Sequence, residues 1–306
     1  MNTMAPTLTD GRIEFRAMGT DCAVQVWAPS HAEELAHLAR TRVEILEQCW
    51  SRFRASSELA LLNARAGQGP IEVSEDLHTL IAAMKHAWEL TDGVFDPTVG
   101  AAMRAWGYDV TFADVIARDY TTDVVTRPAP GMGGVRIDGS TVTLPTGVEL
   151  DSGAIGKGLA ADIIAREIHA AGAIGVLVDL GGDIVVRGRP GADTWRIEVT
   201  DERAPGTMVR TFEIDDEHAG IATSSVLRRR WAGTRHHVID PFTGEIADTG
   251  AVQVTVLAPT GAEAEVIATT ALLDREPERV FERFHVTGIA LDALPAVTYN
   301  TESTHE

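Results

Sequence analysis

The spacing of apolar residues along the chain predicts a succession of strands and helices. Residues 13–27 are rich in β-branched and aromatic side chains and are interrupted at Gly19, so they predict a strand region with a break. Residues 31–50 and 74–90 carry apolar side chains at helical spacing, with charged residues between them. We therefore expect two amphipathic helices whose apolar faces pack in the core.

The remainder of the chain predicts shorter elements. Strands are expected at 135–137, 141–144, 176–180, 184–187, 195–200 and 252–257, helices at 159–171 and 262–273, and a mixture of short elements over 281–294. No internal repeat, low-complexity tract or linker divides the sequence. This pattern predicts an α+β protein with one composite domain over residues 13–297. Residues 1–12 and the polar tail 298–306 are expected to be loosely ordered.

Composition narrows the classes of function. The chain has 26 Lys and Arg against 45 Asp and Glu, a formal charge of −19, so we expect no nucleic acid as a partner. No apolar stretch approaches the roughly 20 residues of a spanning helix, and the first residues show no export signal, which predicts a cytoplasmic protein without membrane insertion. The two cysteines, Cys22 and Cys49, do not indicate a disulfide framework and are expected to be buried thiols.

A glycine-rich turn over residues 151–158 precedes a predicted helix and contains Lys157, one of only two lysines in the chain. Backbone N–H groups in such a turn, together with the helix N-terminus, are able to face an anion such as phosphate. The glycine spacing differs from that of a P-loop and from the dinucleotide fingerprint. A plain connection between strand and helix explains the same residues, so both interpretations stay open.

Two further segments carry candidate chemistry. Gly181, Gly182 and Asp183 lie between apolar strands and suit either a close backbone approach to a ligand or a tight hairpin. His237 and Asp240 are separated by two apolar residues before a proline-containing turn. Because an unperturbed imidazole titrates near neutral pH, His237 is a candidate general base for a hydroxyl nucleophile.

The predicted helix over 262–273 begins with acidic residues. Glu265 and Thr269 are four residues apart, so their oxygens share one helix face and are suited to Mg²⁺. A glutamate near a helix N-terminus is also favourable because of the helix dipole. The residues alone do not decide between these interpretations.

Several short motifs occur in an order that resembles the ApbE-like family of FAD:protein FMN transferases. They span about residues 18–273 and are Met18-Gly19-Thr20, Ser51-Arg52-Phe53, Ser57-Glu58-Leu59 with Asn63, residues 93–100, Trp106-Gly107, residues 151–158, residues 180–183, Ala222-Thr223-Ser224, residues 237–244 and residues 264–269. The resemblance implies an ApbE-like fold related to the T-fold, with FAD bound in a cleft and Mg²⁺ on its pyrophosphate. It also implies transfer of FMN to a threonine or serine of an acceptor flavoprotein, through a phosphoester bond, with release of AMP.

The resemblance assigns roles by position. His237 matches the histidine taken as catalytic base. The backbone carbonyl of Gly156, the carboxylate of Glu265 and the hydroxyl of Thr269 match the metal ligands.

Contacts to FAD are implied at five further positions. Met18 and Asp96 match residues at the flavin end. Lys157, Asp183 and Thr223 match the remaining contacts.

Two positions depart from the family pattern. The family usually has Asp where this chain has Glu265, and a Thr-Ser-Gly segment reads Thr-Ser-Ser over residues 223–225. The basic run that follows, residues 228–230, suits phosphate, an acidic partner segment or a solvated surface. Two alternatives to the transferase remain at this stage: a Mg²⁺-dependent FAD pyrophosphatase that gives FMN and AMP, and a non-catalytic FAD-binding protein.

Overall fold

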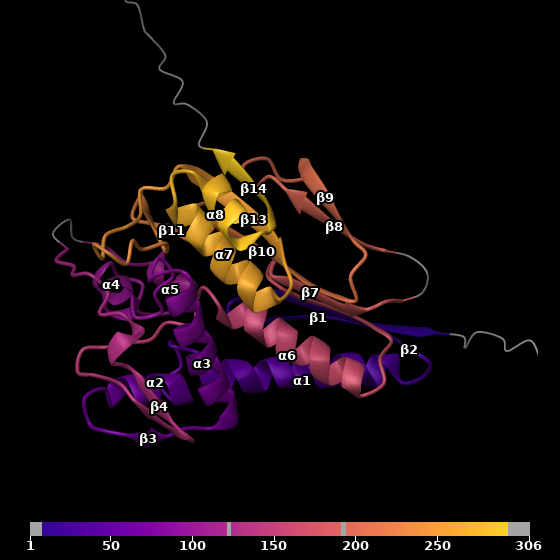
Figure 1. Cartoon of the computed structure of the whole chain (residues 1–306), viewed down its shortest axis with the longest axis horizontal. Coiled ribbons are helices and arrows are strands. Elements are labelled where there is room, and N and C mark those ends of the chain that lie inside the picture. Colours follow the sequence, from indigo (N-terminus) through magenta and orange to yellow (C-terminus); the bar gives the residue numbers. More distant parts are fainter. Residues whose placement is uncertain (1–7, 121–123, 191–193, 293–306) are drawn as a thin grey trace, which may run out of the picture.

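The computed structural model describes residues 8–120, 124–190 and 194–292. Within these residues, seven antiparallel strands form the central sheet, in the order β1-β2-β6-β7-β10-β13-β14. Their bounds are Thr9–Ala17 (β1), Thr20–Ala28 (β2), Gly175–Leu180 (β6), Ile184–Gly188 (β7), His218–Ser225 (β10), Ala251–Ala258 (β13) and Thr287–Asp292 (β14). The sheet therefore joins segments from both ends of the sequence, as Figure 1 shows.

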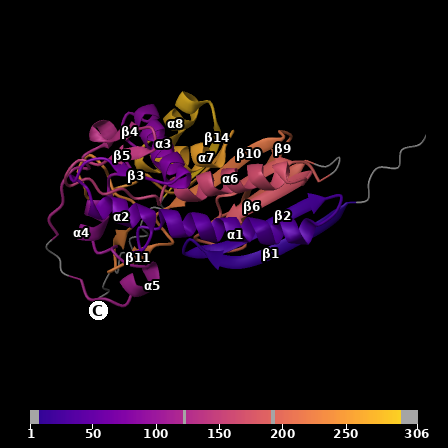
Figure 2. The same cartoon turned by 90° about the horizontal axis from the view of Figure 1, so that it is seen from below.

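Three helices pack on the sheet: α1 (Ala32–Trp50) on β1 and β2, α6 (Gly156–Ala170) on β6 and β7, and α7 (Gly261–Leu273) on β10 and β13. In Figure 2, α1 and α6 run side by side along the sheet. Side chains of a strand alternate between the two faces, so Val185 packs in the main helix-side core while Val186 packs on the other side. There the hairpin β8 (Trp195–Thr200) and β9 (Met208–Ile214) forms a second apolar cluster.

Helix α8 (Pro277–Phe284) packs on α7 and on the edge strand β14. The other described elements lie at one end of this layered unit (Figure 1). They are α2 (Glu58–Ala64), β3 (Ile71–Glu72), α3 (Glu75–Leu90), α4 (Gly100–Ala105), α5 (Phe112–Val115), the 3-10 turn η1 (Met132–Gly134), β4 (Arg136–Asp138), β5 (Thr141–Thr143), β11 (Arg230–Trp231) and β12 (Arg235–His236). Serine side chains cap two of the helices: Ser57 accepts from Ala60 N in α2, and Ser74 from Leu77 N in α3.

The long helices and the α+β class agree with the sequence analysis, because strong apolar periodicity marks them. The predicted break is the tight turn between β1 and β2, where Met18 and Gly19 have φ angles of 51° and 71°. The expectation of a loose N-terminus is wrong for residues 9–12, which pair with β2 in the sheet. Residues 1–7, the tail 298–306 and the predicted domain end at 297 lie outside the described residues.

Several elements were not predicted, among them α2, β9 and β10. Strand β10 is the most consequential, since it carries Thr223 and Ser224. Cys22 is buried as expected, whereas Cys49 is only partly buried, and both are free thiols. Across the described ranges, no helix combines the length and apolarity needed to cross a bilayer.

Candidate functional site

The glycine-rich turn before α6 is held by hydrogen bonds to its own backbone and to the Asp151 side chain. Gly153 N donates to Asp151 Oδ1 at 2.7 Å, and Gly156 N donates to Ser152 O at 2.8 Å. Asp151 also pairs with Arg52 Nε at 2.6 Å, with both side chains 9% exposed. The turn thus fixes where α6 begins and where Lys157 emerges.

Helices α6 and α7 meet at their N-terminal ends through glycine. A Cβ atom at Gly158 would overlap the backbone carbonyl of Gly261, and one at Gly261 would lie 2.7 Å from Gly158 O. Asp162 of α6 accepts hydrogen bonds from Gly261 N and Ala262 N, at 2.8 and 2.9 Å. This close approach places the first turn of α7 beside the first turn of α6.

Lys157, Asp183 and Glu265 form a buried ionic cluster at this junction. Lys157 Nζ pairs with Asp183 Oδ2 and, at 2.6 Å, with Glu265 Oε1. Both carboxylates are 3% exposed. Gly158 N donates to Glu265 Oε2 at 2.8 Å, and Thr223 N donates to Asp183 Oδ1 at 3.3 Å. Four separate segments of the chain are therefore joined at one point.

Burial and ion pairing together set the protonation states of Lys157 and Glu265. Burial raises the pKa of Glu265 to about 7, against the opposing effect of the Lys157 ammonium. Burial disfavours the ammonium of Lys157, but the carboxylates of Asp183 and Glu265 outweigh it and raise the pKa of Lys157 above its ordinary value. Lys157 consequently remains a cation at neutral pH.

Thr269 lies one turn after Glu265 on the same face of α7. Its Oγ1 is 2.8 Å from Ser224 Oγ of β10. Glu265 and Thr269 both line a cavity with a volume of about 420 Å³. The helical spacing therefore presents a carboxylate and a hydroxyl to the same space.

His237 follows β12 and lines the same cavity. Its Nδ1 atom is buried and has no hydrogen-bond partner among the described residues. Burial lowers the pKa of His237 to about 3, and the nearby charges of Arg229, His236 and Lys157 act in the same direction. The imidazole is therefore neutral at physiological pH, the form that accepts a proton.

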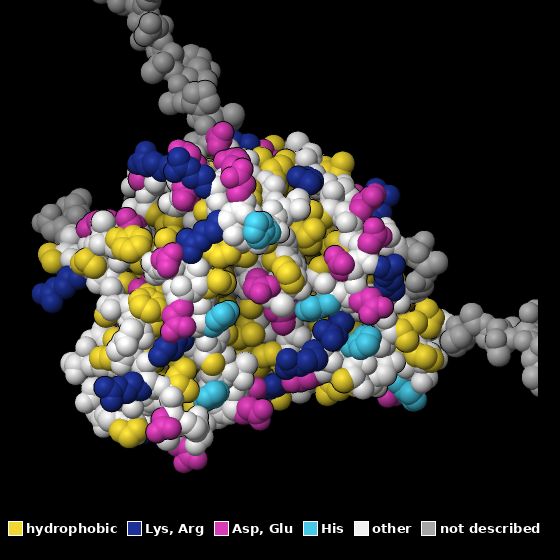
Figure 3. All heavy atoms as spheres, in the orientation of Figure 1, with side chains coloured by type: hydrophobic (Ala, Val, Ile, Leu, Met, Phe, Trp, Pro, Cys, Tyr) yellow, Lys and Arg dark blue, Asp and Glu magenta, His cyan; other side chains and the backbone are white. Residues whose placement is uncertain are grey.

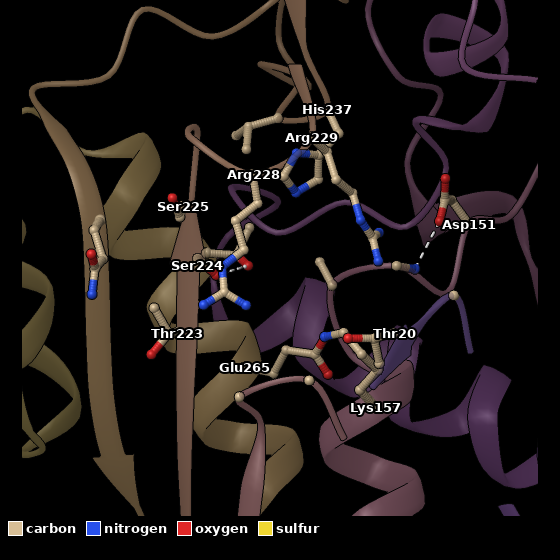
Figure 4. A pocket seen from close by; sticks show the side chains of 18 of the residues that line it. Thr20, Asp151, Lys157, Thr223, Ser224, Ser225, Arg228, Arg229, His237 and Glu265 are labelled. Carbon is tan, nitrogen blue, oxygen red and sulfur yellow. Dashed lines mark hydrogen bonds and ion pairs between the residues drawn. The ribbon is translucent and has the colours of Figure 1, made fainter. Parts of the chain in front are cut away.

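Figure 4 shows the arrangement of the labelled side chains around the cavity. Lys157 and Glu265 extend from one side, and His237 and Arg229 lie on the facing side. Ser225 and Asp151 lie at opposite ends of this view. The cavity is therefore bounded by cationic groups and by the neutral imidazole of His237, which faces the ionic cluster.

The cavity brings together most of the predicted site residues, but not all of them. It is lined by Asp96, Lys157, Thr223, His237, Glu265 and Thr269. Met18, Gly156 and Asp183 are not among the lining residues. Met18 packs against the main core while its neighbours Gly19 and Thr20 reach the cavity, and Asp183 contacts it through Lys157.

Asp96 is held within its own turn, where its Oδ1 accepts from Thr98 N at 2.8 Å and from Thr98 Oγ1 at 2.6 Å. Burial raises its pKa, against the effect of these hydrogen bonds. The adjacent wall is aromatic. Phe53 and Tyr108 have ring centroids 5.4 Å apart, and the Arg52 guanidinium lies 4.6 Å from the Tyr108 centroid. The part of the cavity lined by Phe53 and Tyr108 therefore suits a flat ring.

Sequence reasoning gave no specific role to several cavity residues. Of the basic run, Arg228 and Arg229 line the cavity, although the Arg228 side chain is 63% exposed, and Arg230 is exposed without lining it. A solvated surface therefore describes only part of the run. Arg228 Nε pairs with Glu202 Oε1 at 2.6 Å. The signal for Arg228 and Arg229 was the basic run itself, which follows the Thr-Ser-Ser segment after two intervening residues and suits phosphate, an acidic partner segment or a solvated surface. Glu202 had no signal, because it lies in a turn between two strands of which only the first was predicted.

The expected metal ligands suit Mg²⁺ by the type of their donor atoms. A carboxylate, a hydroxyl and a backbone carbonyl are all oxygen donors, which Mg²⁺ prefers. Gly158 N contacts the Glu265 carboxylate, so the turn that contains Gly156 adjoins α7. In the described part of the chain, no group of three or more His, Cys, Asp or Glu is placed to hold a metal ion. The proposed set therefore depends on one carboxylate, supplemented by neutral oxygens.

Solved structures share this fold. A flavinyl transferase ApbE from Pseudomonas stutzeri superposes with a TM-score of 0.78 at 20% identity, covering 95% of this chain and 94% of that one. An ApbE protein from Thermotoga maritima gives a TM-score of 0.79 at 24% identity, with coverage of 92% and 94%. The architecture is therefore that of the ApbE structures.

Sequence comparisons point in the same direction. The profile of the ApbE family matches residues 18–285. An FAD:protein FMN transferase of Treponema pallidum is 31% identical over 278 residues, which cover 84% of this chain and 76% of the relative. The Escherichia coli K12 protein of the same name is 27% identical, with coverage of 91% and 82%. The chain belongs to the ApbE family.

Proposed function

We propose that this protein is an FAD:protein FMN transferase that joins the FMN part of FAD to a serine or threonine hydroxyl of an acceptor protein. The observation that carries the proposal is a neutral, half-buried His237 whose Nδ1 atom is buried and has no hydrogen-bond partner among the described residues. It faces the ionic cluster of Lys157, Asp183 and Glu265 across one cavity. Relatives that are similar in sequence to this chain are named FAD:protein FMN transferases. The arrangement supplies a base and cationic groups at the places where phosphoryl transfer needs them.

In the proposed reaction, the acceptor hydroxyl gives its proton to His237. The hydroxyl oxygen attacks the phosphorus on the FMN side of the diphosphate and forms the new P–O bond. The P–O bond to the AMP phosphate breaks, and its electron pair leaves with AMP. A base with a pKa below neutral is fully deprotonated at physiological pH, so His237 starts each cycle ready for this transfer.

The remaining cavity residues act on charge and position. Lys157 and Arg229 line the cavity as cations and balance the negative charge of the diphosphate. The N–H groups of Gly153, Gly156 and Gly158 already donate within the protein, so the start of α6 contributes mainly through its dipole and through Lys157. Asp96 and the aromatic wall at Phe53 and Tyr108 hold the flavin end, while Thr223 and the neighbouring Asp183 orient the remaining contacts.

Gly156, Glu265 and Thr269 are proposed to hold Mg²⁺ through a backbone carbonyl, a carboxylate and a hydroxyl. When bound, Mg²⁺ supplies Lewis-acid neutralisation of phosphoryl oxygens. Glu265 is held by Lys157 and by Gly158 N, and Thr269 by Ser224. These contacts orient both side chains toward the same space. We propose a cytoplasmic location for this chemistry.

The test is a reaction of the purified protein with FAD, Mg²⁺ and a candidate acceptor that carries a Ser/Thr flavinylation motif. We expect a covalently fluorescent acceptor band and one AMP for each acceptor modified. AMP with free FMN and no band would indicate a pyrophosphatase instead. A yellow protein that releases no AMP with any divalent ion would indicate a non-catalytic FAD-binding protein. An acceptor whose hydroxyl residue is replaced by alanine is the matched control.

A further inference from the structure

Glu202 presents a carboxylate oxygen that no described residue satisfies. Its side chain is 8% exposed and lines the cavity, although it lies in the turn between β8 and β9. Oε1 pairs with Arg228 Nε at 2.6 Å, whereas Oε2 is buried without a hydrogen-bond partner among the described residues. An unsatisfied buried acceptor is costly for the folded state, and more so when it is ionised. A ligand with an N–H or O–H donor would satisfy this oxygen.

The position of Glu202 is fixed by the sheet beneath it. Glu202 N donates to Gln253 Oε1 at 2.9 Å, and Gln253 Nε2 donates to Thr200 O at 2.9 Å. Gln253 lies in β13 and is 2% exposed, so both groups of its amide are used inside the protein. The hairpin end is therefore attached to the central sheet. A carboxylate held in this way loses little freedom when a ligand binds.

The surroundings of Glu202 suit a flat heterocycle. The cavity is also lined by Ile197, Val199 and Ile221, which belong to the apolar cluster beneath the hairpin. In Figure 4, the Arg228 guanidinium points into the cavity between the labelled Ser225 and Glu265. An acceptor and a cationic donor thus lie side by side, next to an apolar surface.

Charge near this end is local rather than general. The whole chain carries a formal charge of −19, and Figure 3 shows acidic and basic side chains interspersed over the visible face. Glu202 and Arg228 pair with each other at 2.6 Å, so their opposite charges offset each other locally and selectivity here depends on their hydrogen-bonding pattern.

We propose that Glu202 and Arg228 together recognise the edge of one heterocycle of the dinucleotide. Glu202 Oε2 accepts from a ring or amino N–H, and Arg228 donates to the acceptor atom beside it. Adenine offers its 6-amino group next to N1, and the flavin offers N3–H next to a carbonyl. This inference rests on the proposed function, because that function identifies FAD as the ligand of the cavity.

The protein side of the test compares Glu202→Gln with Glu213→Gln. Glu213 is an acid of the same hairpin, 63% exposed, and it is not one of the cavity-lining residues. We expect Glu202→Gln to weaken FAD binding roughly 10- to 100-fold, the usual range for a hydrogen bond to a charged group, as measured by flavin fluorescence. Glu213→Gln should bind FAD like the parent protein. Melting curves of both variants separate a binding defect from a folding defect.

The ligand side uses the parent protein and so does not depend on the folding of any variant. Two analogues are compared with FAD: one with hypoxanthine in place of adenine, and one methylated at flavin N3. Weaker binding of the first, about tenfold or more, assigns the adenine edge to Glu202, and weaker binding of the second assigns the flavin edge. Whichever analogue binds the parent more weakly than FAD should bind Glu202→Gln as well as FAD does.

If both analogues bind the parent like FAD, or if the preference persists in Glu202→Gln, the inference is overturned. If the parent protein still transfers FMN in either case, the proposed transferase function stands and only this inference fails. A parent that neither binds FAD nor releases AMP would overturn the proposed function and this inference together.

Discussion

The two facing sides of the cavity are built in different ways. The side formed by α6 and α7 depends on backbone contact, because Gly158 and Gly261 allow the two helices to meet without intervening side chains. The opposite side depends on side chains: Trp231 Nε1 donates to Trp106 O at 3.2 Å and positions the segment between Arg229 and His237. The first side thus fixes the ionic cluster rigidly. The second presents groups that act on an incoming substrate.

The largest expected effect concerns the second side. We expect His237→Ala to lower FMN transfer by at least about a hundredfold, because the acceptor hydroxyl loses its base. FAD binding should change little, since the phosphate-facing cations remain. Single-turnover transfer and flavin fluorescence measure the two quantities separately.

The neighbouring His236→Asn is the control, because His236 is absent from the cavity-lining residues. Equal transfer rates for His237→Ala and the parent would remove His237 from the mechanism.

The next effect tests the backbone contact of the first side. Gly158→Ala places a methyl group against the Gly261 carbonyl, so we expect the free energy of unfolding to fall by about 1–3 kcal/mol, as for other overpacked sites. Denaturant titration measures this change. Gly133→Ala is the matched control, because its Cβ would meet only Trp88, at 3.7 Å. Similar stability for the two variants would contradict a tight α6–α7 junction.

A smaller effect concerns the carboxylate on α7. We expect Glu265→Gln to raise the Mg²⁺ concentration needed for half-maximal transfer by about tenfold, on the scale known for perturbed metal sites. FAD affinity without metal should change less. Glu265→Asp keeps the charge with a shorter side chain and should retain most of the Mg²⁺ dependence. If Glu265→Gln responds to Mg²⁺ like the parent, the carboxylate is only a helix-start charge.

The smallest effect is a pH dependence of stability. In the unfolded chain His237 binds a proton below about pH 6.5, whereas the folded protein holds its pKa at about 3. The unfolded state therefore binds more protons between these values, and stability falls as the pH drops through this window. Because His237 is partly exposed, we expect a loss of only roughly 1 kcal/mol between pH 7 and 5 relative to His237→Asn. Parallel pH profiles of urea unfolding for the two proteins would contradict this expectation.

Much of the site was accessible from the sequence because its groups lie in short, local motifs. The glycine-rich turn with Lys157 and the helical spacing of Glu265 and Thr269 both indicate ligand chemistry through local spacing alone. Residue type and spacing made His237 a candidate general base, and the resemblance to a family matched it to the histidine taken as catalytic base. The sequence did not predict β10, so the hydroxyl of Ser224 beside Thr269 was not expected.

By itself, the sequence determined the α+β class, the main helices and the residue types available for phosphate and metal chemistry, because periodicity and turn residues act over a few positions. Only the tertiary structure decided that Lys157 joins Asp183 and Glu265, which are 26 and 108 positions away from it. It also decided that Glu202 lines the cavity and has one buried carboxylate oxygen without a partner among the described residues. Such pairings depend on sheet order and on close backbone contact between distant segments, and no local pattern encodes either.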